Sequence, residues 1–126
     1  MEKNFLAVNG SLMRGLALNQ NLVDARAQFV QESKTSANYR LWSIDDSYPA
    51  MLRDEGEGTE IDLEIWEIPL EGLLDVLKKE PPGLCMGKIE IQDGEWVFGI
   101  LGESYLCHGN KEISSWGGWK KYLNKK

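Results

Sequence analysis

The sequence predicts an α+β fold: a small, mixed and mainly antiparallel β-barrel of about six strands, with two or three short helices. Three observations lead to this class. Apolar and polar residues alternate at residues 60–65, as in a half-buried strand. Asp93-Gly94 is a strong hairpin signal between two strand-like runs. Residues 95–101 are apolar on both faces, which predicts a strand covered on both sides, as in a barrel.

The composition indicates a single globular domain and argues against two classes, nucleic-acid-binding proteins and membrane-spanning proteins. The 126 residues are 42% hydrophobic and 27% charged, which is typical of one globular domain over residues 1–126. The net charge of −6 argues against a nucleic-acid-binding protein. No apolar run approaches the roughly 20 residues of a membrane span, and no signal-like segment follows Met1. We therefore expect a cytoplasmic protein without membrane contact.

The first half of the chain contains short elements. Residues 5–8 form an apolar run with the length of a buried strand. Asn21 is a favoured N-cap residue and predicts that a short helix begins there. Phe29 and Val30 suggest a second strand, and residues 39–44 alternate as a third. Tyr48-Pro49 then begins an irregular crossing segment.

The second half has clearer signals. The strand at residues 61–65 changes phase at Ile65-Trp66, which predicts a bulge at that point. Pro69 suits a first helical residue, and Pro81-Pro82-Gly83 ends the helix. We expect a last short helix from about Trp119. The first of these helices carries an apolar stripe predicted to face the core, formed by Leu70, Leu73, Leu74 and Leu77.

The loop after the first strand is the candidate ligand site. Asn9-Gly10-Ser11 interrupts the apolar run, and Gly15 follows. A glycine-containing loop after a buried strand can direct successive backbone N–H groups to one spot, where they hold a carboxylate or phosphate. The alternative is an ordinary tight turn, because Asn-Gly is a common turn dipeptide.

Among the side chains with catalytic potential, one carboxylate is the candidate general acid or base. His108 is the only histidine, and neighbouring side chains such as Cys107 and His108 diverge in a strand, so adjacency does not make them a nucleophile–base pair. The cysteines Cys85 and Cys107 form neither a disulfide framework nor a metal site, and we expect no cofactor. Glu80 directly precedes Pro81, so its backbone is extended and its side chain projects from the end of a helix.

Glu80 has two interpretations. Enclosed at a cleft mouth, it would have a raised pKa and act as a general acid or base. Otherwise it is a solvated helix-end glutamate that follows two lysines. Four further polar residues would orient a small anion if the fold brings them together: Arg14, Tyr39, Arg53 and Tyr105.

The opening loop also carries a resemblance to a known family. Asn9-Gly10-Ser11-Leu12 resembles the signature loop of the γ-glutamylcyclotransferase-like superfamily, in which backbone amides cradle the anionic part of the substrate. The nearer resemblance is to the C-terminal domain of allophanate hydrolases and its stand-alone relatives. It covers nearly the whole chain in order, through residues 15–19, 39–41, 49–53, 65–69, 81–87 and 116–122.

Two positions depart from these families. The resemblance implies a catalytic glutamate of the cyclotransferases at the position of Lys78, two residues before Glu80. It implies a histidine of the allophanate hydrolase domain, which helps to decarboxylate N-carboxyurea to urea, at the position of Leu12. Neither acid or base is therefore present where its family has it.

Two functional hypotheses follow. The first is an enzyme that binds and turns over a small urea-like or γ-glutamyl carboxylate, with the amides of the opening loop (residues 9–15) holding it and Glu80 as the acid/base. The second is a non-catalytic module that binds a small carboxylate or docks onto a separately encoded amidase. The changes at Leu12 and Lys78 favour this second hypothesis.

Overall fold

The computed structural model describes residues 4–125 as two β-sheets and three α-helices. A five-stranded sheet has the order β2-β5-β1-β7-β6, and a three-stranded sheet has the order β4-β3-β8. The strands are β1 (Asn4–Val8), β2 (Gln28–Lys34), β3 (Tyr39–Ile44), β4 (Tyr48–Arg53), β5 (Asp62–Ile68), β6 (Leu84–Glu90), β7 (Trp96–Gly102) and β8 (Lys111–Glu112). The helices are α1 (Asn19–Asp24), α2 (Leu70–Lys79) and α3 (Trp119–Lys125), with 3₁₀ turns at Ser104–Cys107 and Ser114–Trp116. The predicted α+β class is confirmed.

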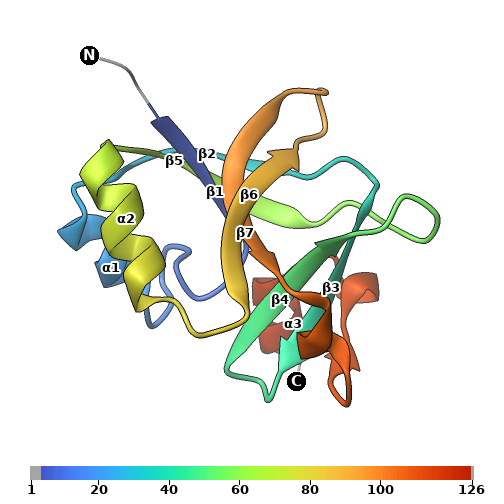
Figure 1. Ribbon diagram of the computed structural model, residues 1–126. Coiled ribbons are helices and arrows are strands. Elements are labelled where there is room, and N and C mark those ends of the chain that lie inside the picture. Colours follow the sequence, from blue (N-terminus) through green and yellow to red (C-terminus); the bar gives the residue numbers. More distant parts are fainter. Residues whose placement is uncertain (1–3, 126) are drawn as a thin grey trace.

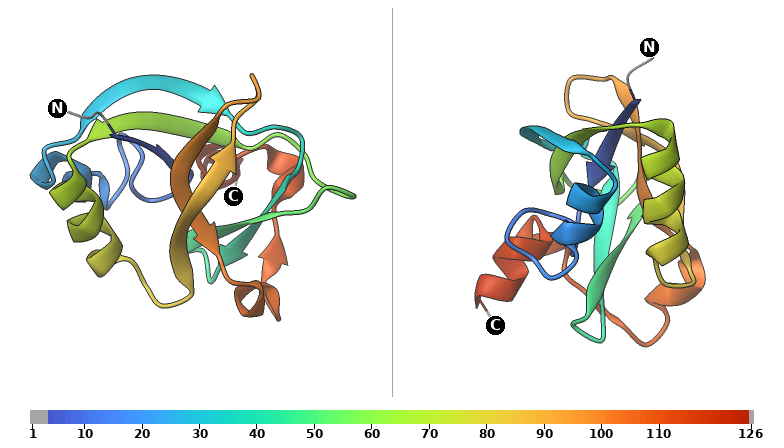
Figure 2. Two further views of the ribbon diagram at one scale, coloured as in Figure 1. Left: turned by 45° about the horizontal axis from the view of Figure 1, so that its top comes forward. Right: turned by 90° about the vertical axis from the view of Figure 1, so that its left-hand side faces the viewer.

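Strand β1 lies at the centre of the larger sheet. It pairs antiparallel with β5 and parallel with β7, and Leu6, Ala7 and Val8 are completely buried. Helices α1 and α2 lie together beside this sheet, while the three-stranded sheet and α3 lie on its other side (Figures 1 and 2). The apolar run at residues 5–8 is therefore a buried strand, as its composition predicts.

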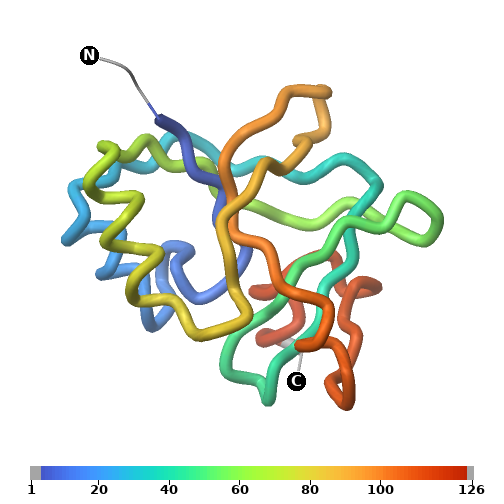
Figure 3. The backbone as a smooth tube through the Cα atoms, viewed as in Figure 1, coloured from blue at the N-terminus to red at the C-terminus, as the bar shows by residue number. Residues whose placement is uncertain are grey.

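The larger sheet curls, but it is not a closed barrel. Its edge strands β2 and β6 meet only beyond their ends, at the antiparallel bridge between Thr35 and Ile91. There the Ser36 N–H donates to the Glu90 carbonyl and the Gln92 N–H to the Lys34 carbonyl, each at 3.0 Å. The curl is visible in the tube of Figure 3. The predicted barrel is thus only a loose description, because the edges pair over a single bridge.

The prediction of an irregular segment at Tyr48-Pro49 is wrong, because these residues begin β4. Strands β3 and β4 pair from Tyr39–Arg53 to Ile44–Tyr48. Asp45 and Asp46 take positive φ angles of 52° and 57° and so turn the chain between the strands. Since β4 is an edge strand, the missing N–H of Pro49 breaks no ladder.

The bulge lies on the strand opposite the predicted one. Strand β5 keeps a continuous register with β1, whereas the register shifts in β2 between Phe29 and Gln31, opposite Trp66 and Ile65. The predicted phase change in β5 has another cause. Residues 63–66 are all buried, so both faces of this strand are covered.

The helix ends and faces differ from their predictions. Helix α1 begins at Asn19 after Leu18, so Asn21 is not its cap. In α2, Leu73 is buried as predicted, but Leu70 and Leu74 are 72% and 54% exposed. Gly72 explains this rotation, because a Cβ atom there would lie 2.5 Å from the carbonyl oxygen of Ala25. The helix therefore packs through its glycine, and part of the leucine stripe faces solvent.

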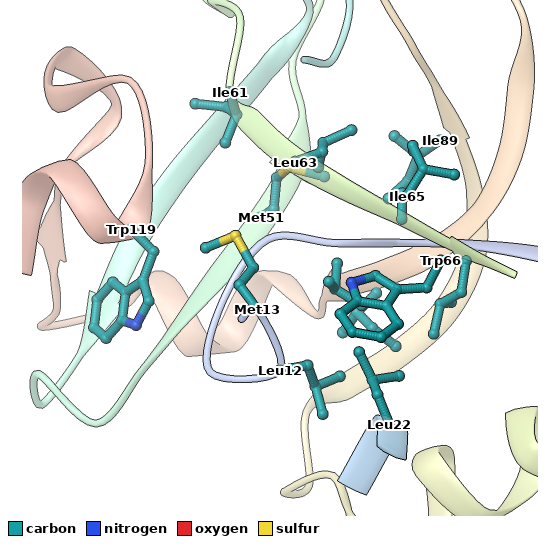
Figure 4. Packing of buried hydrophobic residues seen from close by; sticks show 14 of the residues in the cluster. Leu12, Met13, Leu22, Met51, Ile61, Leu63, Ile65, Trp66, Ile89 and Trp119 are labelled. Carbon is teal, nitrogen blue, oxygen red and sulfur yellow. The ribbon is translucent and has the colours of Figure 1, made fainter. Parts of the chain in front are cut away.

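Strand β7 and helix α3 complete the fold. Trp96 and Phe98 are 52% and 40% exposed, so the prediction that β7 is covered on both faces is wrong near its start. The β6–β7 hairpin projects beyond the other strands there (Figure 1). Helix α3 begins at Trp119, as predicted, and this indole is buried in the core (Figure 4). No helix within residues 4–125 has the length and apolar character needed to cross a membrane.

Candidate functional site

A cavity of about 300 Å³ lies where the opening loop meets the segments after α2 and before β4. Five residues that the sequence analysis selected line it together: Asn9, Gly10, Ser11, Leu12 and Glu80. Most of its remaining lining is apolar, and none of its described lining side chains is cationic. The fold therefore joins the two separate candidates, the loop and the carboxylate, in one place.

Glu80 follows α2 directly and enters the cavity wall because of the proline after it. Its backbone is extended, with φ −77° and ψ 147°, as predicted for a residue that precedes Pro81. Burial raises the pKa of Glu80 from 4.5 to about 7. Near neutral pH both protonation states of this carboxyl are populated, so it can give or take a proton.

The backbone of the opening loop supplies hydrogen-bond donors to the same cavity wall. Two of its N–H groups already have protein acceptors. The Met13 N–H donates to the Gly10 carbonyl at 3.0 Å, and the Arg14 N–H donates to the Glu64 carboxylate at 3.0 Å. Within residues 4–125, the N–H groups of Gly10, Ser11 and Leu12 meet no protein acceptor. Consecutive N–H groups without a protein acceptor are what the predicted anion site at this loop requires.

Side chains fix the loop in this conformation. Asn9 is buried, and its amide donates to the Ile100 carbonyl at 2.9 Å, which ties the loop to β7. The side-chain amide of Asn19, the first residue of α1, donates to the Leu12 carbonyl at 2.8 Å. Gly10 lies against Pro49, where an added Cβ atom would approach the proline ring to 2.5 Å. These contacts hold the loop in one shape, and the close approach to Pro49 is the reason for glycine at position 10.

Leu12 occupies the position that the family resemblance gives to a histidine. Its side chain is 3% exposed and belongs to the hydrophobic core. Figure 4 shows it close to Leu22 of α1 and Trp66 of β5. An apolar contact thus replaces a titratable group, and Glu80 is the carboxyl that remains at the cavity.

Three of the polar residues predicted to orient an anion lie elsewhere. Tyr39 and Arg53 form a register pair at the far end of the β3–β4 hairpin from Tyr48, which lines the cavity. There the Arg53 guanidinium donates to the Tyr39 hydroxyl at 3.2 Å. Arg14 leaves the opening loop towards Glu64 on β5. The structure therefore does not bring these side chains to Glu80.

Two tyrosines lie near the cavity. Tyr48 lines it, and its pKa is raised by burial and by the neighbouring Tyr105, Asp45 and Glu80, so the phenol stays a donor. The sequence does not mark Tyr48 as a site residue, because Tyr48-Pro49 predicts an irregular segment. Tyr105 is 55% exposed and its hydroxyl lies beside Gly83, outside the lining.

The cysteines and the histidine belong to other parts of the surface. Burial raises the pKa of the Cys107 thiol, so it stays protonated near neutral pH. Burial also raises the pKa of Cys85, and His108 is exposed. None of the three lines the cavity around Glu80.

Several known proteins are similar to this chain in fold and in sequence. The structure of a uropathogenic E. coli-specific protein has a TM-score of 0.96 at 48% identity, over 100% of this chain and 99% of that chain. Allophanate hydrolase from Kluyveromyces lactis has a TM-score of 0.93 at 30% identity, over 99% of this chain and 22% of that chain. Urea amidolyase from Lachancea kluyveri is 34% identical over 94% of this chain.

These similarities identify first the fold class and then the family. A γ-glutamyl cyclotransferase structure shares the fold with a TM-score of 0.55, at 12% identity. The fold is therefore γ-glutamylcyclotransferase-like. The model of the allophanate hydrolase C-terminal domain matches residues 4–124, and the chain belongs to that family. It spans only 7% of the length of the urea amidolyase that it matches.

Proposed function

We propose that this domain binds a small urea-like or γ-glutamyl carboxylate in the cavity and turns it over, with Glu80 as the acid/base. One observation carries the proposal: a carboxyl with a pKa of about 7 shares a cavity with the free N–H groups of Gly10, Ser11 and Leu12. The free N–H groups suit the anionic end of a substrate, and the carboxyl suits its reacting nitrogen.

The chemistry of the allophanate hydrolase family gives a concrete reaction. In the decarboxylation of N-carboxyurea, protonated Glu80 donates its proton to the nitrogen that bears the carboxylate. The carbon–nitrogen bond then breaks with its electron pair moving to nitrogen, so urea and carbon dioxide form. After the products leave, a proton from solvent returns to Glu80. The apolar lining excludes water and favours the loss of the charged carboxylate.

Glu80→Gln tests the role of the carboxyl. Two probes are followed by NMR: N-carboxyurea generated in place by an amidase acting on allophanate, and γ-glutamyl-alanine. We expect the variant to lose at least roughly a hundredfold in turnover of the accepted probe while it stays folded, with a melting temperature no lower than that of the wild type near neutral pH. The matched control is Glu71→Gln, an exposed glutamate on α2. Equal turnover by Glu80→Gln and the wild type removes Glu80 from the mechanism.

The alternative function is a module that binds a carboxylate or docks onto an amidase without chemistry. The core position of Leu12 favours it, because the histidine of the family is absent. The multidomain size of the matched urea amidolyase also agrees with an amidase context. Co-elution with an amidase-family protein, together with no turnover of either probe, would support this alternative. Crystals soaked with malonate would show density at Asn9–Leu12 under both functions.

We further propose that the protein acts in the cytoplasm, where the small amides of this class of chemistry are processed. This placement rests on the composition of the chain and on the kind of substrate proposed.

A further inference from the structure

We propose that a hollow between β2, β5 and α3 is a second binding site, which takes a small oxyanion with carboxylate or phosphate groups. The hollow has a volume of about 490 Å³, and three lysines line it: Lys34, Lys120 and Lys121. It shares a wall with the candidate active site, because Met13 lines the hollow while its neighbour Leu12 lines the cavity. The proposal goes beyond the function of Glu80 and does not depend on it.

Charge around the hollow favours an anion. Three lysines and three carboxylates line the hollow. Arg14 lies outside the lining but pairs with two of these carboxylates, so the whole ion-pair network has one positive charge in excess on a chain whose net charge is −6. The pairs are Arg14–Glu32 at 3.2 Å, Arg14–Glu64 at 3.2 Å, Lys120–Glu64 at 3.1 Å, Lys34–Asp62 at 3.4 Å and Lys121–Asp62 at 3.0 Å. A cluster that is positive within an acidic protein concentrates anions locally.

The three lysines keep unused hydrogen-bond donors. A lysine ammonium has three N–H groups, and within residues 4–125 each of these lysines contacts one carboxylate. Lys34 and Lys121 share the carboxylate of Asp62, so the two ammonium groups are held near each other. An oxyanion has several acceptor oxygens and can bind both at once. Because Asp62 already orders these long side chains, binding has less conformational entropy to overcome.

Glu64 forms a fixed base for the hollow. Its side chain is only 3% exposed, and it accepts hydrogen bonds from the Arg14 backbone at 3.0 Å, the Trp66 indole at 3.2 Å and the Lys120 ammonium at 3.1 Å. Burial alone would raise the pKa of Glu64, but these donors hold it below its usual range. Arg14 and Lys120 thus compensate the negative charge of Glu64, and the ion pair with Glu64 holds Lys120 at the hollow.

The test is a titration of the isotope-labelled protein with inorganic phosphate and, separately, with succinate, followed by NMR. We expect saturable shifts at the backbone amides of Met13, Lys34 and Lys120 and at the Trp66 indole N–H. Chloride at equal ionic strength should give no saturable shift. Saturation by phosphate alone identifies a phosphate compound, and saturation by succinate alone identifies a carboxylate.

Variants connect the shifts to the lysines. The double variant Lys34→Met/Lys121→Met should bind the accepted probe about a hundredfold more weakly, since each charged hydrogen bond contributes about a factor of ten. Lys88→Met, on the exposed face of β6, is the control and should bind as the wild type does. If the double variant does not fold, Lys121→Met alone should weaken binding about tenfold.

Three results would overturn the second site. The first is equal binding by the wild type and the double variant. The second is a response to chloride that equals the response to both probes, which indicates screening only. The third is saturable shifts confined to Asn9–Leu12, which places the anion in the cavity and leaves the function of Glu80 standing. Loss of turnover in Glu80→Gln, in turn, has no bearing on the lysine hollow.

Discussion

Glu80 and Glu64 lie in the walls of the two hollows that the opening loop separates, and their pKa values move in opposite directions. Burial raises the pKa of Glu80 to about 7, and none of the described side chains around its cavity is a cation. Glu64 is more deeply buried, yet donors from Arg14, Lys120 and Trp66 hold its pKa below the usual range. Burial alone therefore does not decide whether a carboxyl is reactive. The partners that the fold supplies decide it.

This difference separates a chemical role from a structural one. A carboxyl that is buried without a positive partner is ready to exchange a proton near neutral pH. A carboxyl that is buried with four donors keeps its charge and ties together β5, α3 and the opening loop. The same residue type thus provides the candidate acid/base on one side of the loop and an anchor on the other.

The largest expected effect comes from removing the anchor. Glu64→Ala leaves the Arg14 N–H and the Trp66 indole without their acceptor in the protein interior. We expect the free energy of unfolding to fall by about 3 kcal/mol at neutral pH, measured by denaturant titration. Glu60→Ala, at an exposed position just before β5, is the control and should change it by less than about 0.5 kcal/mol. A loss as small as that of the control would mean that Glu64 is not an anchor.

A second effect, of opposite sign, is expected at Glu80. The folded-state pKa is above the unfolded one, so ionisation of the unfolded chain lowers stability as pH rises from 4.5 to about 7. Glu80→Gln cannot ionise and avoids this loss. We expect equal stability of variant and wild type at pH about 4, and a variant more stable by about 2 kcal/mol at pH about 8. Parallel stability curves across this range would show that Glu80 has an ordinary pKa.

The smallest effect sharpens the comparison by weakening one donor to Glu64. Lys120→Met removes the ammonium that lies 3.1 Å from Glu64 and should raise the pKa of that carboxyl. The stability from a lowered carboxyl pKa exists above the unfolded pKa and is lost as pH falls. We therefore expect a loss of about 1 kcal/mol at pH about 7 and almost none at pH about 3. Lys79→Met on α2 is the control, and thermal melts at both pH values are the measurement.

Local signals predicted the backbone conformation of the segments that line the cavity. The apolar run before Asn9-Gly10 is a buried strand, and Pro81 gives Glu80 its extended backbone. Longer-range features were missed where packing overrides a pattern. Leu70 and Leu74 follow helical spacing, but the contact of Gly72 with Ala25 turns them towards solvent.

Tyr48 and Glu64 show why the rest of the site escaped prediction. Tyr48 precedes a proline, and only its pairing on an edge strand makes it part of β4 and of the cavity wall. Glu64 alternates with apolar residues and so resembles a solvated strand position. It is buried because α3 and the opening loop cover that face and bring Lys120 and Arg14 to it.

By itself, the sequence determined the opening loop with its free backbone donors, the hairpin at Asp93-Gly94, and a glutamate held extended before a proline. Tertiary structure decided that this loop and Glu80 share one cavity, that Arg14, Tyr39 and Arg53 stay away from it, and that Glu80 and Glu64 have opposite pKa shifts. The physical reason is one of range. Backbone conformation depends on neighbours along the chain, whereas desolvation and charge pairing depend on segments that only the folded chain brings together.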